Sequence, residues 1–272
     1  MADVPAWLAA ARARAEQPPR SPREPLHVDG AVVGSVEPAL AQRWVEAGLP
    51  VRRTDAGWHV EGSVHAGSST ETGADAALAA LARWLHDAGL AGRWRDERLA
   101  VTDAGGRVLG AVERSVVRAF GITTFAVHLI GCADDGRVWV QKRALDKAID
   151  PGLWDTTMGG QVAAGEAVET SLARETMEEA GLDVAALLDL QPAPRITFRR
   201  PVEEGWLVEH IDVFTATLPA GAEPVNRDGE VERFECLDLT ALEARLAAAE
   251  FTLEATLILA AWLQRRSGAP AD

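Results

Sequence analysis

The segment from Gly159 to Leu182 constrains this chain more than any other, because its glycines and charges fall at defined spacings. It reads GGQVAAGEAVETSLARETMEEAGL, with glycines on both sides of a charged stretch. Gly165 permits a tight turn into a helix, and Gly181 is the residue type that commonly ends one. The pattern therefore predicts one charged helix over residues 168–180, entered through a glycine-rich turn.

Three glutamates of this helix, Glu175, Glu178 and Glu179, are spaced i, i+3 and i+4, so their carboxylates share one face. Like charges about 5–6 Å apart repel by roughly 3 kcal/mol per pair at an effective dielectric near 20. A half-buried trio of this kind requires a cation, and hard oxygen ligands favour Mg²⁺ or Mn²⁺. A solvated acidic helix face would explain an isolated pair, but not the spaced glycines, Glu166 and Arg174.

The segment resembles the Nudix box, G-x5-E-x7-R-E-U-x-E-E-x-G-U, in which U is aliphatic. The matching residues are Gly160, Glu166, Arg174, Glu175, Glu178, Glu179, Gly181 and Leu182. Thr176 departs from the first aliphatic position, but threonine is close to valine in shape, so the departure concerns packing rather than chemistry. The resemblance implies a Mg²⁺-dependent enzyme that hydrolyses a diphosphate linkage in a small molecule.

The resemblance also implies a metal site on the helix. Glu178 and Glu179 would bind Mg²⁺ together with the backbone carbonyl of Gly159. Glu175 would be a further ligand or the base that activates water. The chemistry would be metal-assisted attack of water on phosphorus.

Two further sets of residues would support this site. Arg174 would hold Glu175 in position, and Glu166 would brace Arg174 or the loop. Many family members recruit one more acid from a later strand or loop, for which this chain offers Glu230 and Glu232; we prefer Glu230.

The stretch before the box resembles a Nudix subgroup that includes isopentenyl-diphosphate isomerase. It contains Arg143 and Lys147, which are placed to meet phosphate oxygens, although ordinary strand-edge charges are the alternative. The isomerase needs a cysteine in the loop where this chain has Met158. We therefore do not expect isomerisation.

A weaker resemblance extends over nearly the whole chain, to thiamine-pyrophosphokinase-related Nudix proteins with an extra N-terminal domain. That family includes hydrolases of oxidised or damaged thiamine diphosphates, which release the monophosphate and phosphate. The segments that resemble it outside the box are Trp94–Val101, Arg114, Phe120–His128, Asp228–Phe234 and Phe251–Arg266.

Hydrophobic periodicity and turn residues predict two α/β units. We expect a small α/β accessory domain over residues 1–120 and a Nudix domain over 121–272, an α/β/α sandwich around a mixed β-sheet. The predicted helices cover residues 6–17, 38–47, 74–88, 168–180, 239–249 and 253–265; the predicted strands cover 31–36, 51–61 as a hairpin, 99–102, 108–112, 124–131, 137–142, 195–198 and 208–217.

Composition limits the partners. The net charge is -14, and residues 123–272 contain 26 acidic and 13 basic side chains, which argues against a nucleic-acid partner. No apolar run approaches the roughly 18 residues that span a bilayer, so we expect no membrane partner. The two cysteines, Cys132 and Cys236, exclude a disulfide framework and favour a cytoplasmic protein.

Four functions compete at this stage. The first is the hydrolysis of oxidised thiamine diphosphate analogues, and the runner-up is the hydrolysis of another nucleoside diphosphate derivative, such as a nucleotide sugar or dinucleotide. An isomerase and an inactive binding module are opposed by Met158 and by the intact box, respectively. We expect the first unit to influence substrate choice rather than chemistry.

Overall fold

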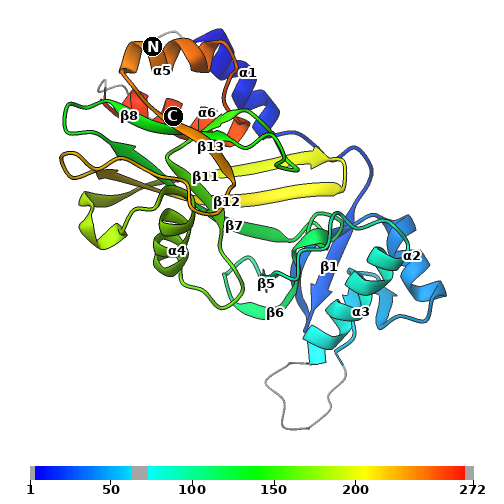
Figure 1. Ribbon diagram of the computed structural model, residues 1–272. Coiled ribbons are helices and arrows are strands. Elements are labelled where there is room, and N and C mark those ends of the chain that lie inside the picture. The colour runs from blue at the N-terminus through cyan, green and yellow to red at the C-terminus, as the bar shows by residue number, and fades with distance from the viewer. Residues whose placement is uncertain (1–3, 63–72, 267–272) are drawn as a thin grey trace.

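The chain folds into two sheet-based units joined side by side, as the ribbon in Figure 1 shows. The structure, a computed structural model, describes residues 4–62 and 73–266. Three segments of the predicted domains lie outside these ranges: residues 1–3, 63–72 and 267–272. Within the described residues, no helix combines the length and the hydropathy that crossing a membrane requires.

The first unit is a four-stranded sheet with the strand order β2-β1-β4-β3, accompanied by two helices and a separate hairpin. The strands are β1 (Glu24–Val28), β2 (Ala31–Val36), β3 (Val51–Thr54) and β4 (Gly57–Val60); the helices are α2 (Pro38–Glu46) and α3 (Gly73–Asp87); the hairpin is β5 (Arg98–Thr102) and β6 (Val108–Glu113). Leu78 and Leu81 of α3 are fully buried, as the spacing of leucines along the helix predicts.

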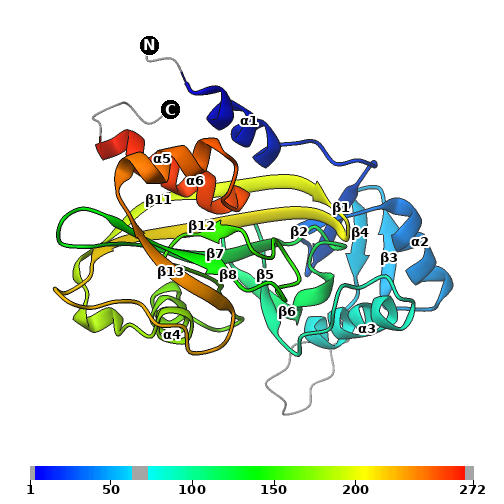
Figure 2. The same cartoon turned by 45° about the horizontal axis from the view of Figure 1, so that its top comes forward.

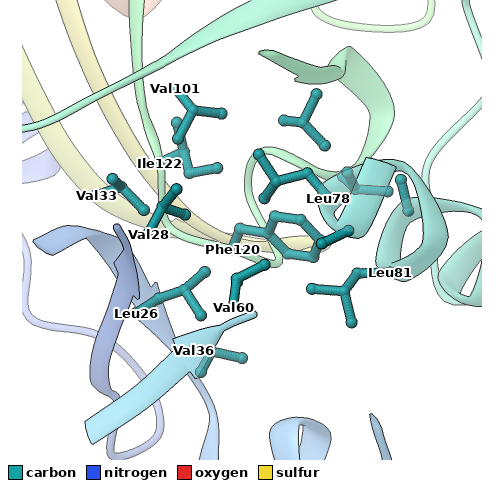
Figure 3. Packing of buried hydrophobic residues seen from close by; sticks show 14 of the residues in the cluster. Leu26, Val28, Val33, Val36, Val60, Leu78, Leu81, Val101, Phe120 and Ile122 are labelled. Atoms are coloured by element: carbon teal, nitrogen blue, oxygen red, sulfur yellow. The ribbon is translucent and has the colours of Figure 1, made fainter. Parts of the chain in front are cut away.

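Figure 3 shows the core of this unit, in which side chains from the sheet, from α3 and from the connecting segment after β6 point toward one another. Phe120 of that connecting segment is fully buried and meets Trp44 edge-on, with ring centroids 5.2 Å apart. The residues that lead into the second unit therefore belong to the core of the first.

The second unit is a seven-stranded mixed sheet between helices on both faces, as Figures 1 and 2 show. Its strands are β7 (Thr123–Cys132), β8 (Val138–Arg143), β9 (Trp154–Asp155), β10 (Met158–Gln161), β11 (Leu188–Val202), β12 (Gly205–Thr217) and β13 (Val231–Leu237). Helix α4 (Val168–Ala180) covers one face; α1 (Ala6–Ala15), α5 (Leu239–Ala247) and α6 (Leu253–Arg266) cover the other. Two short 3₁₀ turns, Arg114–Val116 and Val184–Ala186, complete the elements. The predicted α/β fold class is confirmed.

The pairing of β7 explains why the sheet is mixed. It runs parallel to β12 from Thr123 to Cys132 and antiparallel to β10 and β8 on its other side. The glycines at positions 159 and 160, which precede the charged helix, lie in β10 and pair with His128 and Val127. This short strand was not predicted.

Strand β11 is far longer than the predicted segment of residues 195–198. It contains Pro192, Pro194 and Pro201, and its register with β12 shifts near the first two. Proline lacks the N–H group that a central strand needs, so it is tolerated only at bulges or sheet edges. β11 is the edge strand of this sheet, a position that local sequence does not reveal.

Helix α1 packs against the second unit, although it precedes the first unit in the chain. Leu8, Ala11 and Ala15 are buried in the same cluster as residues of α6. The apolar core of the first unit spans residues 26–122. A domain division at residue 120 stays a prediction, and α1 belongs by packing to the later domain.

The tip of the β11–β12 hairpin contacts the connecting segment between the units. The N–H of Trp206 donates to the carbonyl of Arg118 over 2.9 Å, and a Cβ at Gly205 would overlap the same carbonyl. Gly205 also has a φ of +139°, a conformation that side chains disfavour. The close approach of the two units therefore requires glycine at this position.

We predict that Gly205→Ala lowers the free energy of unfolding by about 3 kcal/mol or more, from the left-handed conformation and the overlap together. The matched control is Gly221→Ala, since Gly221 has a φ of +78° but nothing within 4 Å of its would-be Cβ. That control should cost only about 1–2 kcal/mol. Denaturant titration measures both values, and equal costs for the two variants would contradict this account of the contact.

Candidate active site

The charged helix forms where the sequence predicts it, and its ends are set by the expected glycines. α4 covers Val168–Ala180, and Gly181 ends it in the left-handed conformation with a φ of +63°. The turn before it includes Gly165, with a φ of +84°. These two positions fix where the helix begins and ends beside β10.

Arg174, in the middle of α4, donates hydrogen bonds to three carboxylates, one from the turn before the helix and two from the helix itself. It donates to both oxygens of Glu166, over 3.1 and 3.0 Å, and to Glu175 over 2.9 Å and Glu178 over 3.0 Å. Ser171 adds a hydrogen bond of 2.5 Å to Glu166. These contacts hold the side chains in the arrangement that the resemblance implied, while their catalytic roles stay predictions.

Glu179 is the buried member of the trio, with 3% of its surface exposed. Its Oε2 atom accepts from the backbone N–H of Gly159 and from Gln141 Nε2, each over 3.0 Å. Burial nevertheless raises the pKa of Glu179 to about 8, because these two hydrogen bonds only partly replace water. Without a bound cation, burial therefore favours the protonated form of this carboxyl.

Glu175 and Gly160 depend on each other sterically. The Glu175 side chain is 15% exposed, and burial raises the pKa of its carboxyl above the ordinary value. A Cβ at Gly160 would overlap that carboxylate. Glycine at this position of β10 therefore leaves the space that Glu175 occupies.

A second group of acids faces Glu179 from the segment before β13. Carboxylate oxygens of Glu179, Asp228 and Glu230 lie within 4.8 Å of one another. The Gly229 turn, with a φ of +87°, separates the two later acids. Three oxygen donors of this kind, one of them buried, fit a hard divalent cation.

Sequence reasoning missed Asp228, although it selected Glu230 from the same segment. The N–H of Glu230 donates to Asp228 Oδ1 over 2.8 Å, so a tight turn places both carboxylates together. The Asp-Gly pair at positions 228 and 229 was the available signal for such a turn. Glu232, the alternative to Glu230, instead pairs with Lys142 over 3.3 Å and Arg233 over 2.6 Å.

Arg143 and Lys147, the predicted phosphate ligands, stand beside these acids. Arg143 donates to Asp155 over 3.3 Å and to the carbonyl of Ile149 over 3.0 Å, and Lys147 forms an ion pair with Glu230. Burial opposes ionisation of Glu230, but the hydrogen bond from Lys147 and the charges of Lys147, Arg143 and Arg114 hold the pKa of Glu230 below its ordinary value. Arg114 belongs to the first unit, so both units contribute charge here.

One cavity of about 720 Å³ is lined by the acids and bases of this site: Glu175, Glu178, Glu179, Asp228, Glu230, Arg143, Lys147 and Arg174. It extends from the α4 carboxylates to a second pair of acids, Glu209 and Glu254, beneath the start of α6. Glu209 accepts from Thr124 over 3.0 Å and from Gln161 over 2.7 Å. Burial, with the charge of Glu209, raises the pKa of Glu254 to about 7. The cavity thus has two acidic regions with arginines between and around them.

His128 also lines the cavity, and its Nδ1 atom is partnered within the fold. Nδ1 lies 2.9 Å from Thr156 Oγ1 and 3.7 Å from Asp155, and burial lowers the pKa of the ring. Its ring also occupies the space beside Gly159 that a Cβ would need. These contacts make His128 a buried, hydrogen-bonded residue at the cavity wall.

Comparison with known proteins identifies the family. The NUDIX domain model matches residues 123–256. The isopentenyl-diphosphate Delta-isomerase of Leifsonia xyli is 32% identical over 168 residues, which cover 60% of this chain and 88% of that protein. An uncharacterized Nudix hydrolase of Pseudomonas aeruginosa is 34% identical over 149 residues, covering 55% of this chain and 84% of that one.

Among solved structures, a Deinococcus radiodurans protein shares 25% identity with a TM-score of 0.47, over 57% of this chain and 92% of its own. The sequence relatives show that this chain belongs to the Nudix superfamily. The comparisons also support the pyrophosphohydrolase activity that the sequence predicts for this chain.

We predict that Glu179 makes the cation-free protein less stable as the pH rises from about 5 to 8, whereas the lowered pKa of His128 acts in the opposite direction below about 6.5. The pKa of Glu179 is raised from 4.5 to about 8, so the folded state binds more protons than the unfolded state in this window, and deprotonation favours unfolding. Mg²⁺ replaces the lost proton, so its stabilising effect should grow with pH. Thermal unfolding in EDTA and in Mg²⁺, at several pH values, measures both effects.

Two variants separate the contributions to this pH dependence. Glu179→Gln should flatten the EDTA profile and weaken the response to Mg²⁺. Glu254→Gln removes the other carboxyl whose pKa is strongly raised. This variant should flatten the EDTA profile in part and leave the Mg²⁺ response intact. An unchanged Mg²⁺ response in Glu179→Gln would exclude Glu179 from the metal site.

Proposed function

We propose that this Nudix protein hydrolyses a small-molecule diphosphate with a divalent cation, Mg²⁺ or Mn²⁺, held by the carboxylates of Glu175, Glu178, Glu179 and Glu230, by Asp228, and by the carbonyl of Gly159. The observation that carries the proposal is the approach of Glu179 to Asp228 and Glu230 within 4.8 Å, at the wall of the large cavity. Gathering two further carboxylates around the buried Glu179 is costly unless a cation compensates their charge. All donors are hard oxygens, which suits these ions.

The cation and the residues around it would each have a separate role in hydrolysis. When bound, the cation supplies positive charge to the diphosphate oxygens. Glu175, half-buried and with a raised pKa, would accept a proton from the attacking water. Arg174 positions Glu175 and Glu178 through its hydrogen bonds, and Glu166 fixes Arg174 in turn.

Arg143 and Lys147 are proposed to hold phosphate oxygens. Both line the cavity beside the acidic group, and each is already oriented by a protein partner. A diphosphate would compete with Glu230 for Lys147, because charge-assisted hydrogen bonds to phosphate are of similar strength.

Hydrolysis is favoured over isomerisation by the placement of the sulfur groups. Met158 is fully buried in the apolar cluster beneath α4, with Leu129 and Leu172. Neither Cys132 nor Cys236 lines the large cavity. Within the described residues, no thiol therefore reaches the position where the isomerase needs its cysteine.

For the substrate, we propose oxidised thiamine diphosphate analogues, cleaved to the monophosphate and phosphate. The proposal is supported by the whole-chain resemblance, and the cavity volume of about 720 Å³ lies in the range for compact ligands. A nucleotide sugar or dinucleotide is the second candidate, because the same cation site would serve any diphosphate.

We predict that Glu178→Gln and Glu179→Gln each lower kcat by more than about a hundredfold without unfolding the protein, since even groups one step removed from a metal cost about 10–100-fold. Glu175→Gln should lower kcat far more than it changes KM. Glu169→Gln is the control, because Glu169 lies on the same helix but is exposed and outside the cavity. Steady-state phosphate release in Mg²⁺ measures all four, and near-wild-type rates in both metal-site variants would refute the assignment.

We predict a higher kcat/KM for oxothiamine or oxythiamine diphosphate than for thiamine diphosphate, with thiamine monophosphate untouched. An oxo-ring adds a carbonyl acceptor, and a buried donor left unpaired by the normal ring costs about 1–3 kcal/mol, roughly a ten- to hundredfold difference. Parallel kinetics at one Mg²⁺ concentration, with ADP-ribose, a dinucleotide and isopentenyl diphosphate in the same panel, measure the preference. A clear preference for a nucleotide derivative would instead support the second candidate.

A further inference from the structure

A small recess lies between the two units and adjoins the large cavity. Its volume is about 120 Å³, and it shares Arg114, Arg118, Gln161 and Glu209 with the cavity wall. The first unit lines it with arginines at positions 93, 95, 114 and 118; the second unit contributes Ala148 and Ile149 together with two carboxylates, Glu204 and Glu209. The recess is therefore a side branch of the proposed active site, in whose wall four arginines outnumber two glutamates.

The arginines of this wall retain donors for a ligand. Arg114 uses Nη1 in an ion pair with Glu97 at 2.7 Å, and Arg118 uses Nη1 in a longer pair with Glu204 at 3.5 Å. Each guanidinium has five N–H donors, so one acceptor leaves most of them available. Their side chains are 36% and 27% exposed, which leaves them accessible while their stems are packed.

The backbone around these arginines is held firmly in place. The N–H of Arg114 donates to the carbonyl of Glu97 over 2.8 Å, and the carbonyl of Arg118 accepts from Trp206 in the second unit. The same segment contains Val116 and Val117, both buried in the first core. The guanidinium groups are thus carried on a rigid segment, as a selective contact requires.

The size of the recess limits what it can accept. Whole small ligands occupy pockets of about 300–1,000 Å³, so a recess of about 120 Å³ suits only a small group such as a single phosphate. A terminal phosphate has three free oxygens and up to two negative charges, whereas a bridging phosphate has two free oxygens and one charge. Arginines that hydrogen-bond the additional oxygen of a terminal phosphate would discriminate between these two groups.

We propose that Arg114 and Arg118 bind the terminal phosphate of the substrate, so that the N-terminal unit makes this enzyme selective for terminal diphosphates over bridging ones. The inference rests on the proposed hydrolysis of a diphosphate in the adjoining cavity. It places thiamine-type and nucleoside diphosphates ahead of nucleotide sugars and dinucleotides.

The test is direct binding of a non-hydrolysable probe, methylenediphosphonate, compared with its P,P′-dimethyl ester, in which both terminal groups are capped. Calorimetric titrations in Mg²⁺ compare the wild type with Arg114→Gln, Arg118→Gln and the control Arg52→Gln. Arg52 belongs to the same unit, is 56% exposed in an ion pair with Glu61, and lies outside both hollows.

The wild type should bind the uncapped probe at least about tenfold more tightly than the capped one, and each cavity variant should lose about ten- to a hundredfold in affinity for the uncapped probe alone. Arg52→Gln should bind both probes as the wild type does. Equal affinities for the two probes in the wild type, or unchanged affinities in the cavity variants, would overturn the proposal.

Two features keep the outcome interpretable. Among the described residues, the ion pair of Arg118 with Glu204 is longer than that of Arg114 with Glu97, so Arg118→Gln decides the result if Arg114→Gln lowers the unfolding temperature. Because the titration needs no turnover, a protein that binds the probe as expected but hydrolyses no diphosphate would refute the proposed function while supporting the assignment of Arg114 and Arg118 to a terminal phosphate.

Discussion

The repulsion among the carboxylates of α4 is the constraint on which the rest of the site depends. Glu175, Glu178 and Glu179 share one helix face because of their spacing, and two of them are largely buried. Arg174 offsets part of this charge, and the backbone N–H of Gly159 and the amide of Gln141 serve the most buried oxygen. Burial, with a smaller contribution from the charge of Glu175, still raises the pKa of Glu179, so these contacts compensate only in part. A divalent cation would compensate the remaining negative charge, and its binding would be linked to both protonation and folding.

Glycines make this arrangement sterically possible. Position 160 leaves room for Glu175, position 159 leaves room for the His128 ring, and position 205 allows the hairpin to reach the connecting segment. None of the three contacts is local in sequence. Each glycine is needed because another part of the chain approaches its backbone, and the acidic helix, the strand beside it and the first unit are brought together by these approaches.

The two units share a continuous set of contacts around one cavity. Helix α1 crosses from the N-terminus to pack against α6, while the segment around Phe120 belongs to the first core and leads directly into β7. Figure 2 shows how the hairpin of β11 and β12 reaches toward the first unit. Arg114 and Arg118 lie at this junction, which gives the N-terminal unit a route to influence substrate choice without supplying a metal ligand.

Sequence by itself determined the family, the charged helix with both of its ends, and the grouping of three carboxylates on one face, because helical geometry converts spacing directly into position. Only the tertiary structure decided that Asp228 joins Glu179 and Glu230, that Glu232 does not, and that Arg114 and Arg118 border the same cavity. It also decided that a proline-containing segment forms the long edge strand β11, since a missing N–H is tolerated only where no partner strand needs it. Residues far apart in the chain meet through sheet order and the packing of the two units, and neither is encoded in local periodicity.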